Sequence, residues 1–489
     1  MSDDGKLILA IDQGTTSTRA LIFDQNGQVR AQAQKELPIS TPHSGWVEQD
    51  AKQIWEDVVA VCRDVIAKIG IDLITGIGIT NQRETTIVWD AKTGEPVYNA
   101  IVWQDRRTAD FCKSLKTEEG IIQKRTGLLA DPYFSATKIR WILDHIGGYR
   151  EDLLFGTVDS YLLWKLTEGR VHATDITNAS RTMLFNITTH EWDEDQCNLI
   201  GVPRHMLPKV HDNCHTFGQT TLFEKPLDIL AMAGDQQAAT FGQACFEKGM
   251  VKSTYGTGCF ALMNTGEHVV ISKNRLLSTI VWRINGKATY ALEGSIFVAG
   301  AAIQFLRDNL KFFNHAGDSQ TLAQSVADTD GVVFVPSFTG LGAPYWDPDA
   351  RGAVLGLSRG TTTAHITRAV LDAQGYQTRD LMNAMVADMG SDVLKSIRVD
   401  GGLVANDYVC QQIANQTGVD IDRPSNAEAT VWGVAAMAFL QAGIFKGLDD
   451  ITGVYKRDKQ FLPRDDIQNK ESGYNDWAKV IKAIQSFAR

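Results

Sequence analysis

The stretch "AIDQGTTSTRALIFD", residues 10–24, joins two apolar strand-like runs through a turn of glycine and hydroxyl residues. The first run, Leu7–Ile11, leads into Asp12, and the second run is Ala20–Phe23. A tight hairpin exposes backbone N–H groups at its tip, and such a nest can bind phosphate oxygens without a helix. The hydroxyls would add donors, and Arg19 would supply the positive charge that a lysine provides in other phosphate loops. For one hairpin taken alone, an ordinary exposed turn is the alternative.

The same pattern recurs near the midpoint of the chain. "VKSTYGTGCFALMNT", residues 251–265, again predicts a strand, a Gly/Thr turn and a strand. In both halves an Asn-Gly pair follows, at 26–27 and 285–286, and this pair favours a type I′ hairpin turn. A helix and further strands come after each pair. Two halves that open alike predict two similar mixed α/β domains that face each other across a cleft, over residues 1–245 and 246–489.

Several helices are predicted from apolar spacing and from terminal signals. In the first half an apolar stripe runs along Ile54–Ile69, and Asp50 with Gln53 indicates a capping box at its start. In the second half the pattern predicts a helix over residues 296–310. Further on, "LDAQGYQTRDL" places Gly375 inside a predicted helix, where it costs about 1 kcal/mol relative to Ala.

Composition limits the class of protein. The 489 residues are 44% hydrophobic and 22% charged, as in globular proteins, and this length favours two domains. The net charge of −10 argues against nucleic acid or an anionic membrane as a partner. Seven scattered cysteines without a Cys-x-x-Cys pair indicate a reducing compartment. With an acidic start and no apolar run near the ~20 residues of a membrane span, we expect a cytoplasmic protein.

Three further motifs carry candidate chemistry. "MAGDQQAATFG" places Asp235 at the end of a predicted strand, where it could face an acceptor hydroxyl in phosphoryl transfer; a helix cap or Asx turn is the alternative. In "NQRETT" the adjacent Arg83 and Glu84 suit a compact ligand that donates and accepts hydrogen bonds, with a surface ion pair as the alternative. In "IVWQDRR" the indole of Trp103 could hold the carbon side of a polyol or could belong to the core.

Taken together, these motifs resemble those of the FGGY carbohydrate kinases, which share the two-domain ATPase fold of actin and hexokinase. The similarity runs along nearly the whole chain and includes "DQGTTSTRA", "TNQRETTIVW", "DPYFSATK", "MAGDQQAA", "STYGTGCF", "GLGAPYWDPDARG" and "VDGG". Within the family, "NQRE", the tyrosine of "DPYFSATK" and "GDQQ" are typical of the members that act on glycerol. The resemblance implies an α/β fold of two ribonuclease H-like domains, with mixed sheets that flank a central nucleotide cleft.

The resemblance also implies a reaction and a site. The reaction would be the ATP- and Mg²⁺-dependent phosphorylation of glycerol to sn-glycerol 3-phosphate, with Asp235 as general base and with Asp12 and Asp235 facing the metal. Glycerol would contact Arg83, Glu84, Trp103, Tyr133, Asp235, Gln236 and Phe260. ATP would contact Thr15, Thr16, Ser17, Arg19, Thr257, Gly300, Gln304, Gly402 and Asn406. It further implies a homo-oligomer, a dimer or a tetramer, with no insertion into a membrane.

Two other functions stay open on the sequence. One is an FGGY kinase for a pentulose or another small polyol, against which Arg83, Glu84 and Tyr133 argue. The other is an actin-like or chaperone-like ATPase, which would need a polymer interface or an added peptide-binding domain.

Overall fold

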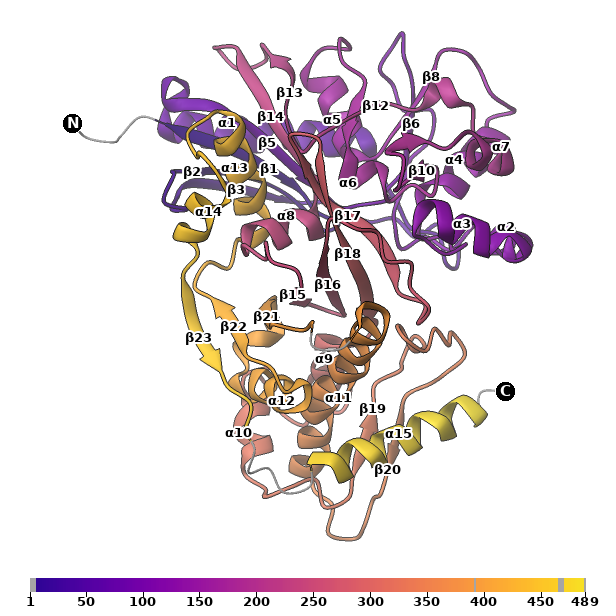
Figure 1. Cartoon of the computed structure of the whole chain (residues 1–489), viewed down its shortest axis with the longest axis vertical. Coiled ribbons are helices and arrows are strands. Elements are labelled where there is room, and N and C mark those ends of the chain that lie inside the picture. The colour runs from indigo at the N-terminus through magenta and orange to yellow at the C-terminus, as the bar shows by residue number, and fades with distance from the viewer. Residues whose placement is uncertain (1–5, 391–392, 465–469, 488–489) are drawn as a thin grey trace, which may run out of the picture.

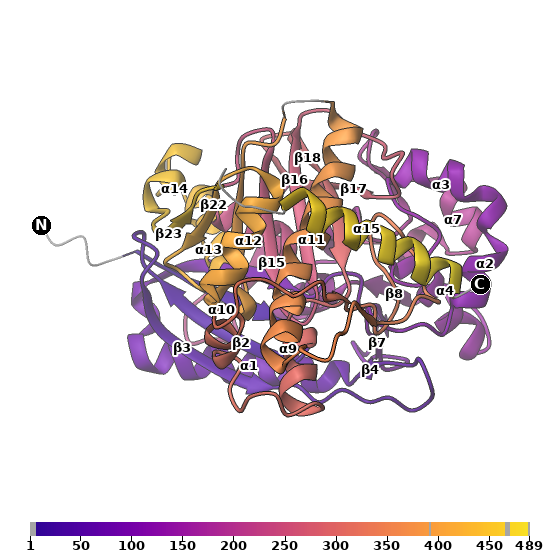
Figure 2. The same cartoon turned by 90° about the horizontal axis from the view of Figure 1, so that it is seen from below.

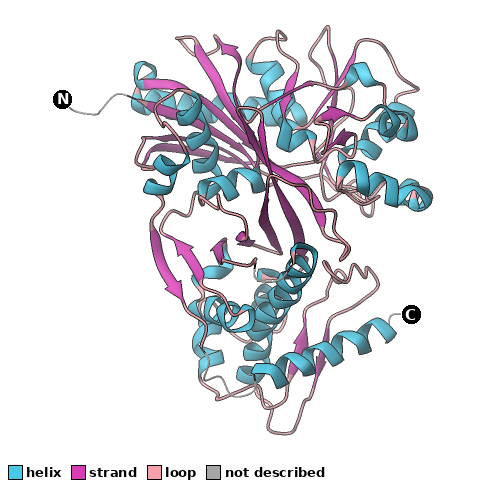
Figure 3. Ribbon diagram, in the orientation of Figure 1, coloured by secondary structure: helices cyan, strands magenta, loops and turns pink. Residues whose placement is uncertain are grey.

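Two mixed β-sheets, one in each half of the chain, organise the computed structural model (Figure 1). The structure describes residues 6–390, 393–464 and 470–487. In Figure 1 the first half occupies the top of the view and most of the second half the bottom. Figure 3 shows helices packed around the strands of each half. The predicted α/β architecture with two mixed sheets is confirmed.

The first sheet contains the predicted opening hairpin. Its strands lie in the order β3(Val29–Glu36), β2(Ser17–Phe23), β1(Leu7–Gln13), β5(Ile74–Asn81), β14(Leu227–Gly234) and β13(Cys214–Thr220). Strands β1 and β2 pair antiparallel, with Asp12 opposite Arg19. Strands β1, β5 and β14 run parallel to one another, so their carboxyl ends meet at one edge of the sheet.

The second sheet repeats this arrangement. Its strands lie in the order β17(Leu277–Ile284), β18(Lys287–Ile296), β16(Cys259–Gly266), β15(Met250–Tyr255), β21(Ser396–Asp400), β22(Ile421–Pro424) and β23(Arg457–Phe461). The run β18-β16-β15-β21-β22 has the same order and the same strand directions as β3-β2-β1-β5-β14. The predicted similarity of the two halves therefore holds for their topology.

Helices and short strands complete both halves. The helices are α1(Ala51–Ile69), α2(Ala109–Ser114), α3(Glu119–Thr126), α4(Ser135–His145), α5(Val158–Leu166), α6(Ile176–Ala179), α7(Glu194–Ile200), α8(Asp235–Gly242), α9(Gly300–Asp308), α10(Asp318–Gln324), α11(Thr363–Met389), α12(Asp407–Thr417), α13(Ala429–Gln441), α14(Leu448–Val454) and α15(Lys470–Phe487). The short strands are β4(Glu48–Gln49), β6(Ile87–Asp90), β7(Ala100–Ile101), β8(Leu153–Gly156), β9(Ala173–Asp175), β10(Phe185–Asn186), β11(Glu191–Trp192), β12(Lys209–His211), β19(Val333–Val335) and β20(Ala353–Leu355). Seen from below, α15 lies across α11 (Figure 2). Within the described residues, no helix combines the length and the apolar character of a membrane span.

Helices cover both faces of the first sheet. Because side chains alternate along a strand, Leu9 and Ile11 of β1 pack with α1 and α5, whereas Ile8 and Ala10 pack with α13. Helix α13 comes from the last part of the chain, which thus returns to the first sheet. The chain passes from the first sheet to the second between β14 and β15. A boundary at 245/246 remains our proposal for the division of the chain.

Helices α8 and α13 cross at two glycines. A Cβ atom at Gly433 would overlap the carbonyl oxygen of Ala238, and one at Gly242 would overlap the carbonyl oxygen of Ala429. Close approach of the two backbones therefore requires glycine at both positions. Since α8 begins at Asp235, this crossing fixes the position of a predicted site residue.

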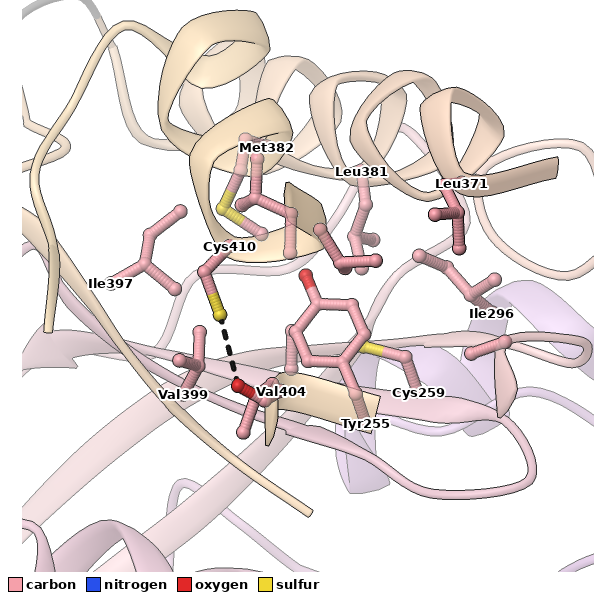
Figure 4. Packing of buried hydrophobic residues seen from close by; sticks show 14 of the residues in the cluster. Tyr255, Cys259, Ile296, Leu371, Leu381, Met382, Ile397, Val399, Val404 and Cys410 are labelled. Atoms are coloured by element: carbon pink, nitrogen blue, oxygen red, sulfur yellow. Dashed lines mark hydrogen bonds between the residues drawn. The ribbon is translucent and has the colours of Figure 1, made fainter. Parts of the chain in front are cut away.

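The hairpin formed by β15 and β16 packs against the hydrophobic core of the second half (Figure 4). The ring of Tyr255, at the end of β15, is fully buried among side chains of β16, α11 and α12, and its hydroxyl lies 2.7 Å from Thr378 Oγ1. Gly375 lies inside α11, as predicted. A Cβ there would come within 3.0 Å of the Gln412 carbonyl oxygen in α12, so the glycine permits the close packing of these helices.

Three local predictions are wrong. The first Asn-Gly pair does not form a type I′ turn, because only Gly27 has a positive φ. The Asp24 carboxylate accepts hydrogen bonds from the backbone N–H groups of Asn26 and Gln28 and stabilises a different turn. The pair at 285–286 has two positive φ values, as a type I′ turn requires. Asp50 does cap α1, but Gln53 donates to Asp57 instead of completing a capping box. The helix expected over 296–310 begins only at Gly300, since β18 continues to Ile296.

Candidate active site

The carboxyl ends of three parallel strands bring the predicted polar residues together. Asp12 lies near the end of β1, Arg83 follows β5, and Asp235 follows β14. Asp235 is the first residue of α8, whose N-cap is Gly234, so the alternative that Asp235 caps the helix is wrong. Its Oδ1 atom lies 3.2 Å from Nε of Arg83. Ligands of open α/β sheets bind at such strand ends.

A pocket of about 280 Å³ opens beside these residues. It is lined by Asp12, Gly14, Ser17, Arg19, Gln34, Asp235, Gln236, Thr254 and Thr430. The lining includes the first hairpin, the start of α8, strand β15 of the second half and helix α13. The predicted phosphate hairpin and the predicted base therefore share one pocket.

The two carboxylates of this pocket are partly deprived of water. Burial raises the pKa of Asp12, although Arg19 opposes the shift through a contact of 2.5 Å to Oδ2. Burial also raises the pKa of Asp235, against the opposing charges of Arg83 and Lys252, and the nearby charge of Asp12 adds to the rise. A cation between the two carboxylates would relieve this repulsion.

A metal at this position would need ligands from outside the chain. Within the described ranges, no group of three or more His, Cys, Asp or Glu side chains could hold a metal ion. Two carboxylates completed by water and phosphate oxygens are, however, the kind of oxygen donor set that Mg²⁺ uses in phosphoryl-transfer sites. The donor chemistry of Asp12 and Asp235 fits that ion.

Arg83 and Glu84 lie inside the protein, so the alternative of a surface ion pair is wrong. Arg83 is 3% exposed and Glu84 is 1% exposed. The guanidinium of Arg83 binds Glu293 with both terminal nitrogens, at 2.7 and 3.0 Å. Glu84 accepts from Nε of Arg181 at 2.6 Å. Burial raises the pKa of Glu84, opposed by Arg83 and Arg181.

Glu84 also has an unusual backbone. Its φ of +59° lies in the left-handed region, which a residue with a long side chain rarely adopts. The Glu84 carbonyl oxygen accepts from the side chains of Thr86, Ser135 and Lys138, at 3.1, 3.0 and 3.2 Å. Strained conformations that the surroundings hold in place are common at functional sites.

Three aromatic rings lie beside these charged groups. The ring of Trp103 lies 5.7 Å from that of Tyr133 and 6.0 Å from that of Phe260, in edge-on arrangements. The Trp103 indole N–H donates to Thr15 Oγ1 at 2.9 Å, and the Tyr133 hydroxyl accepts from Arg83 at 3.4 Å. Trp103 is partly exposed, unlike a core tryptophan, and Phe260 comes from β16 of the second half. The predicted acceptor residues thus touch one another across both halves.

The predicted nucleotide residues of the second half gather around its hairpin. The Thr257 carbonyl accepts from the N–H groups of Ala299 and Ala301, and the Gly300 N–H donates to Gly256 at 2.9 Å. A Cβ at Gly300 would come within 2.6 Å of the Gly256 carbonyl oxygen, so the hairpin tip and the start of α9 need a glycine where they meet.

The other residues that are predicted to contact ATP lie on different elements of the two halves. Gly402 follows Gly401, where a Cβ would overlap the Tyr255 carbonyl oxygen at the end of β15. Asn406 caps α12 by accepting from the N–H of Val409 at 3.2 Å. Gln304 is exposed on α9. In the first hairpin, Thr15 and Ser17 are partly exposed and Thr16 is exposed.

Sequence reasoning missed four charged side chains that contact the site. They are Arg181, Glu293, Lys252 and Glu428. Arg181 donates to Glu84, and Glu293 accepts from Arg83. Lys252 donates to Gln236 at 2.5 Å, and Glu428 accepts from Arg19 at 2.7 Å. Lys252 is the only charged residue of β15, and Glu293 is the only charged residue of β18 beyond the exposed Lys287 at the start of that strand. A single charge in such a run is a usable signal, because a buried charge needs a partner.

Two family models match the chain. The N-terminal domain model of the FGGY family of carbohydrate kinases matches residues 7–242, and the C-terminal domain model of the same family matches residues 251–442.

Known proteins are similar over almost the whole length. The chain is 54% identical to a glycerol kinase of Rhodospirillum rubrum and 51% identical to one of Geobacillus sp., each time over 99% of both chains. Among solved structures, Plasmodium falciparum glycerol kinase with ADP superposes with a TM-score of 0.92 at 34% identity, over 98% of both chains. A xylulose kinase of Lactobacillus acidophilus reaches a TM-score of 0.89 at 22% identity, which shows the fold alone.

Proposed function

Since the chain belongs to the FGGY family of carbohydrate kinases, we propose that it transfers the γ-phosphoryl group of ATP to glycerol and forms sn-glycerol 3-phosphate. The observation that carries the proposal is the contact between Arg83 and Asp235. It joins a buried group of acceptor-binding residues to a carboxylate that lines the same pocket as the phosphate hairpin.

The acceptor residues would hold glycerol by its hydroxyls and by its carbons. Arg83 donates hydrogen bonds and Glu84 accepts them, while the rings of Trp103, Tyr133 and Phe260 exclude water beside the carbon chain. Asp235, with Gln236 next to it, would accept the hydrogen bond of the attacking hydroxyl and take its proton as phosphoryl transfer proceeds. Its side chain is 31% exposed and so stays accessible from the pocket.

The two hairpins would hold the nucleotide from opposite sides. On the first half the phosphates would meet Thr15, Thr16, Ser17 and Arg19. On the second half the nucleotide would meet Thr257, Gly300, Gln304, Gly402 and Asn406. Backbone N–H groups and hydroxyls at the hairpin tips suit phosphate oxygens, and the Arg19 guanidinium adds charge.

Asp12 and Asp235 would hold Mg²⁺. When bound, the ion would neutralise negative charge on the phosphate oxygens. The two raised pKa values and the shared pocket support this assignment.

An ADP-release assay with MgATP tests the reaction against a panel of glycerol, dihydroxyacetone, erythritol, xylulose and ribulose. We expect kcat/KM to be highest for glycerol, because Arg83 and Glu84 suit a small polyol. A higher kcat/KM for a pentulose would assign the enzyme to another branch of the family. ATP hydrolysis that no acceptor stimulates would favour an actin-like or chaperone-like ATPase.

We further propose that the enzyme works in the cytoplasm as a homo-oligomer, a dimer or a tetramer. The odd number of scattered, unpaired cysteines supports the location, since six of the seven are buried thiols. Sedimentation analysis of the purified protein gives the oligomeric state; a monomer at micromolar concentration would contradict the second part.

A further inference from the structure

Glu293 is a buried charged residue that has no charged neighbour opposite it in the adjacent strands. It lies in β18 of the second sheet, is 1% exposed, and has Leu262 and Leu277 as its neighbours in the adjacent strands. Burial of a carboxylate among apolar neighbours is unfavourable unless the carboxylate is paired and hydrogen-bonded. The two residues that donate hydrogen bonds to Glu293 both come from the first half of the chain.

Those partners are two arginines of the acceptor region. The Glu293 carboxylate accepts hydrogen bonds from both terminal nitrogens of Arg83, at 2.7 and 3.0 Å, and from one terminal nitrogen of Arg181, at 3.1 Å. Paired hydrogen bonds between a guanidinium and a carboxylate fix the plane of the guanidinium. Although burial would raise the pKa of Glu293, Arg181 and Arg83 hold it at about 2, so this carboxylate is ionised at neutral pH.

The orientation of the Arg83 guanidinium determines which groups its other N–H donors face. With its plane fixed by Glu293, Nε lies 3.2 Å from Asp235, and one terminal nitrogen lies 3.4 Å from the Tyr133 hydroxyl. Arg181 in turn holds Glu84. Without the Glu293 charge, Arg83 and Arg181 would repel each other, and Asp235 would be drawn into a closer pair with Arg83.

We propose that Glu293 is a positioning residue of the acceptor site, which reaches from the second half of the protein and orients Arg83 and, through Arg181, Glu84. The inference rests on the proposed function, because it assigns those side chains to the acceptor. It makes acceptor binding dependent on a contact between the two halves.

The test is Glu293→Gln, which keeps the size of the side chain and removes its charge. KM and kcat are measured for glycerol, or for whichever acceptor the panel assigns, so that a different substrate does not affect the result. We expect KM for the acceptor to rise roughly 10- to 100-fold, as loss of ground-state binding predicts, and KM for ATP to stay within about threefold. An acceptor KM equal to that of the parent would overturn the proposal.

A double-mutant cycle distinguishes positioning from a general structural role. If Glu293 acts through Arg83, the effect of Glu293→Gln on kcat/KM should largely disappear in an Arg83→Ala background. Additive effects of the two substitutions would contradict the proposal. Asp380→Asn is the matched control, because it also removes a buried carboxylate, one bound by Tyr345, Tyr474 and Trp477. It should lower the melting temperature without changing the acceptor KM.

A second variant covers the case in which Glu293→Gln does not fold. Glu293→Asp keeps the charge but withdraws it by one methylene, and melting curves identify which variants are folded. A raised acceptor KM in Glu293→Asp supports the proposal, and a KM equal to that of the parent overturns it.

Discussion

Nε of Arg83 lies 3.2 Å from Oδ1 of Asp235, although the two residues are about 150 positions apart in sequence. Arg83 is buried, whereas the Asp235 side chain is 31% exposed toward the pocket. The pair therefore connects the interior acceptor residues to the pocket that contains the phosphate hairpin. A substitution at either residue should therefore affect the other.

Asp235→Asn should lower kcat by roughly 10²- to 10⁴-fold, the usual contribution of general-base catalysis. The amide keeps the size of the side chain but cannot take the proton. KM for ATP should change much less, since the two hairpins hold most of the phosphate contacts. Steady-state kinetics on protein with a normal melting curve checks this. A kcat within about threefold of the parent would rule out Asp235 as the base.

Propane-1,2-diol and propane-1,3-diol should be poor acceptors, with kcat/KM lower than that of glycerol by up to ~10⁴-fold. Each diol lacks one hydroxyl and would leave a buried group of Arg83 or Glu84 without its partner. The same assay, with each diol in place of glycerol, measures the ratio. Turnover of either diol within a few-fold of glycerol would show that these two side chains do not read the acceptor hydroxyls.

Gly433→Ala should destabilise the fold by about 1–3 kcal/mol, because the new methyl group overlaps the backbone of α8 and forces two helices apart. Gly453→Ala in α14 is the matched control, because a Cβ there meets nothing within 4 Å. The control should be neutral or stabilising by up to about 1 kcal/mol, as helix propensity predicts. Urea unfolding compares the two variants; equal midpoints would contradict the tight crossing of α8 and α13.

His172 should make the protein less stable as the pH falls below about 6.5. Its ring donates to the Phe155 carbonyl at 2.8 Å, and burial lowers its pKa to about 4. Between these values the unfolded chain binds a proton that the folded protein does not, so stability is complete above pH 6.5 and is lost as the pH falls toward 4. The loss is on the order of 3 kcal/mol.

Comparison with His172→Gln tests that pH dependence. The free energy of unfolding of this variant, measured in urea from pH 7.5 to pH 4.5, should depend less steeply on pH, by about one proton, because glutamine does not titrate. The exposed His43→Gln serves as the control and should keep the slope of the parent. Equal slopes for the parent and His172→Gln would contradict the assignment.

Local sequence determined the elements that carry the chemistry. Two continuous apolar runs on either side of the Gly/Thr turn predict the hairpin, because short apolar runs and turn residues act over a few positions. The same reasoning places Asp235 after a strand. It fails where a distant or competing group takes over: the Asp24 carboxylate changes the turn at Asn26, and β18 continues to Ile296, so that the predicted helix begins four residues late, at Gly300.

The sequence by itself therefore determined the α/β class, the repeated hairpins and the motifs that resemble the FGGY kinases. Only the tertiary structure decided which side chains meet: Glu293 with Arg83, Lys252 with Gln236, and Glu428 with Arg19. Each of these contacts joins residues from different parts of the fold, and no periodicity or spacing encodes such a pairing. Burial supplies the physical reason, because a charge removed from water must find its partner wherever the fold brings one, however far along the chain.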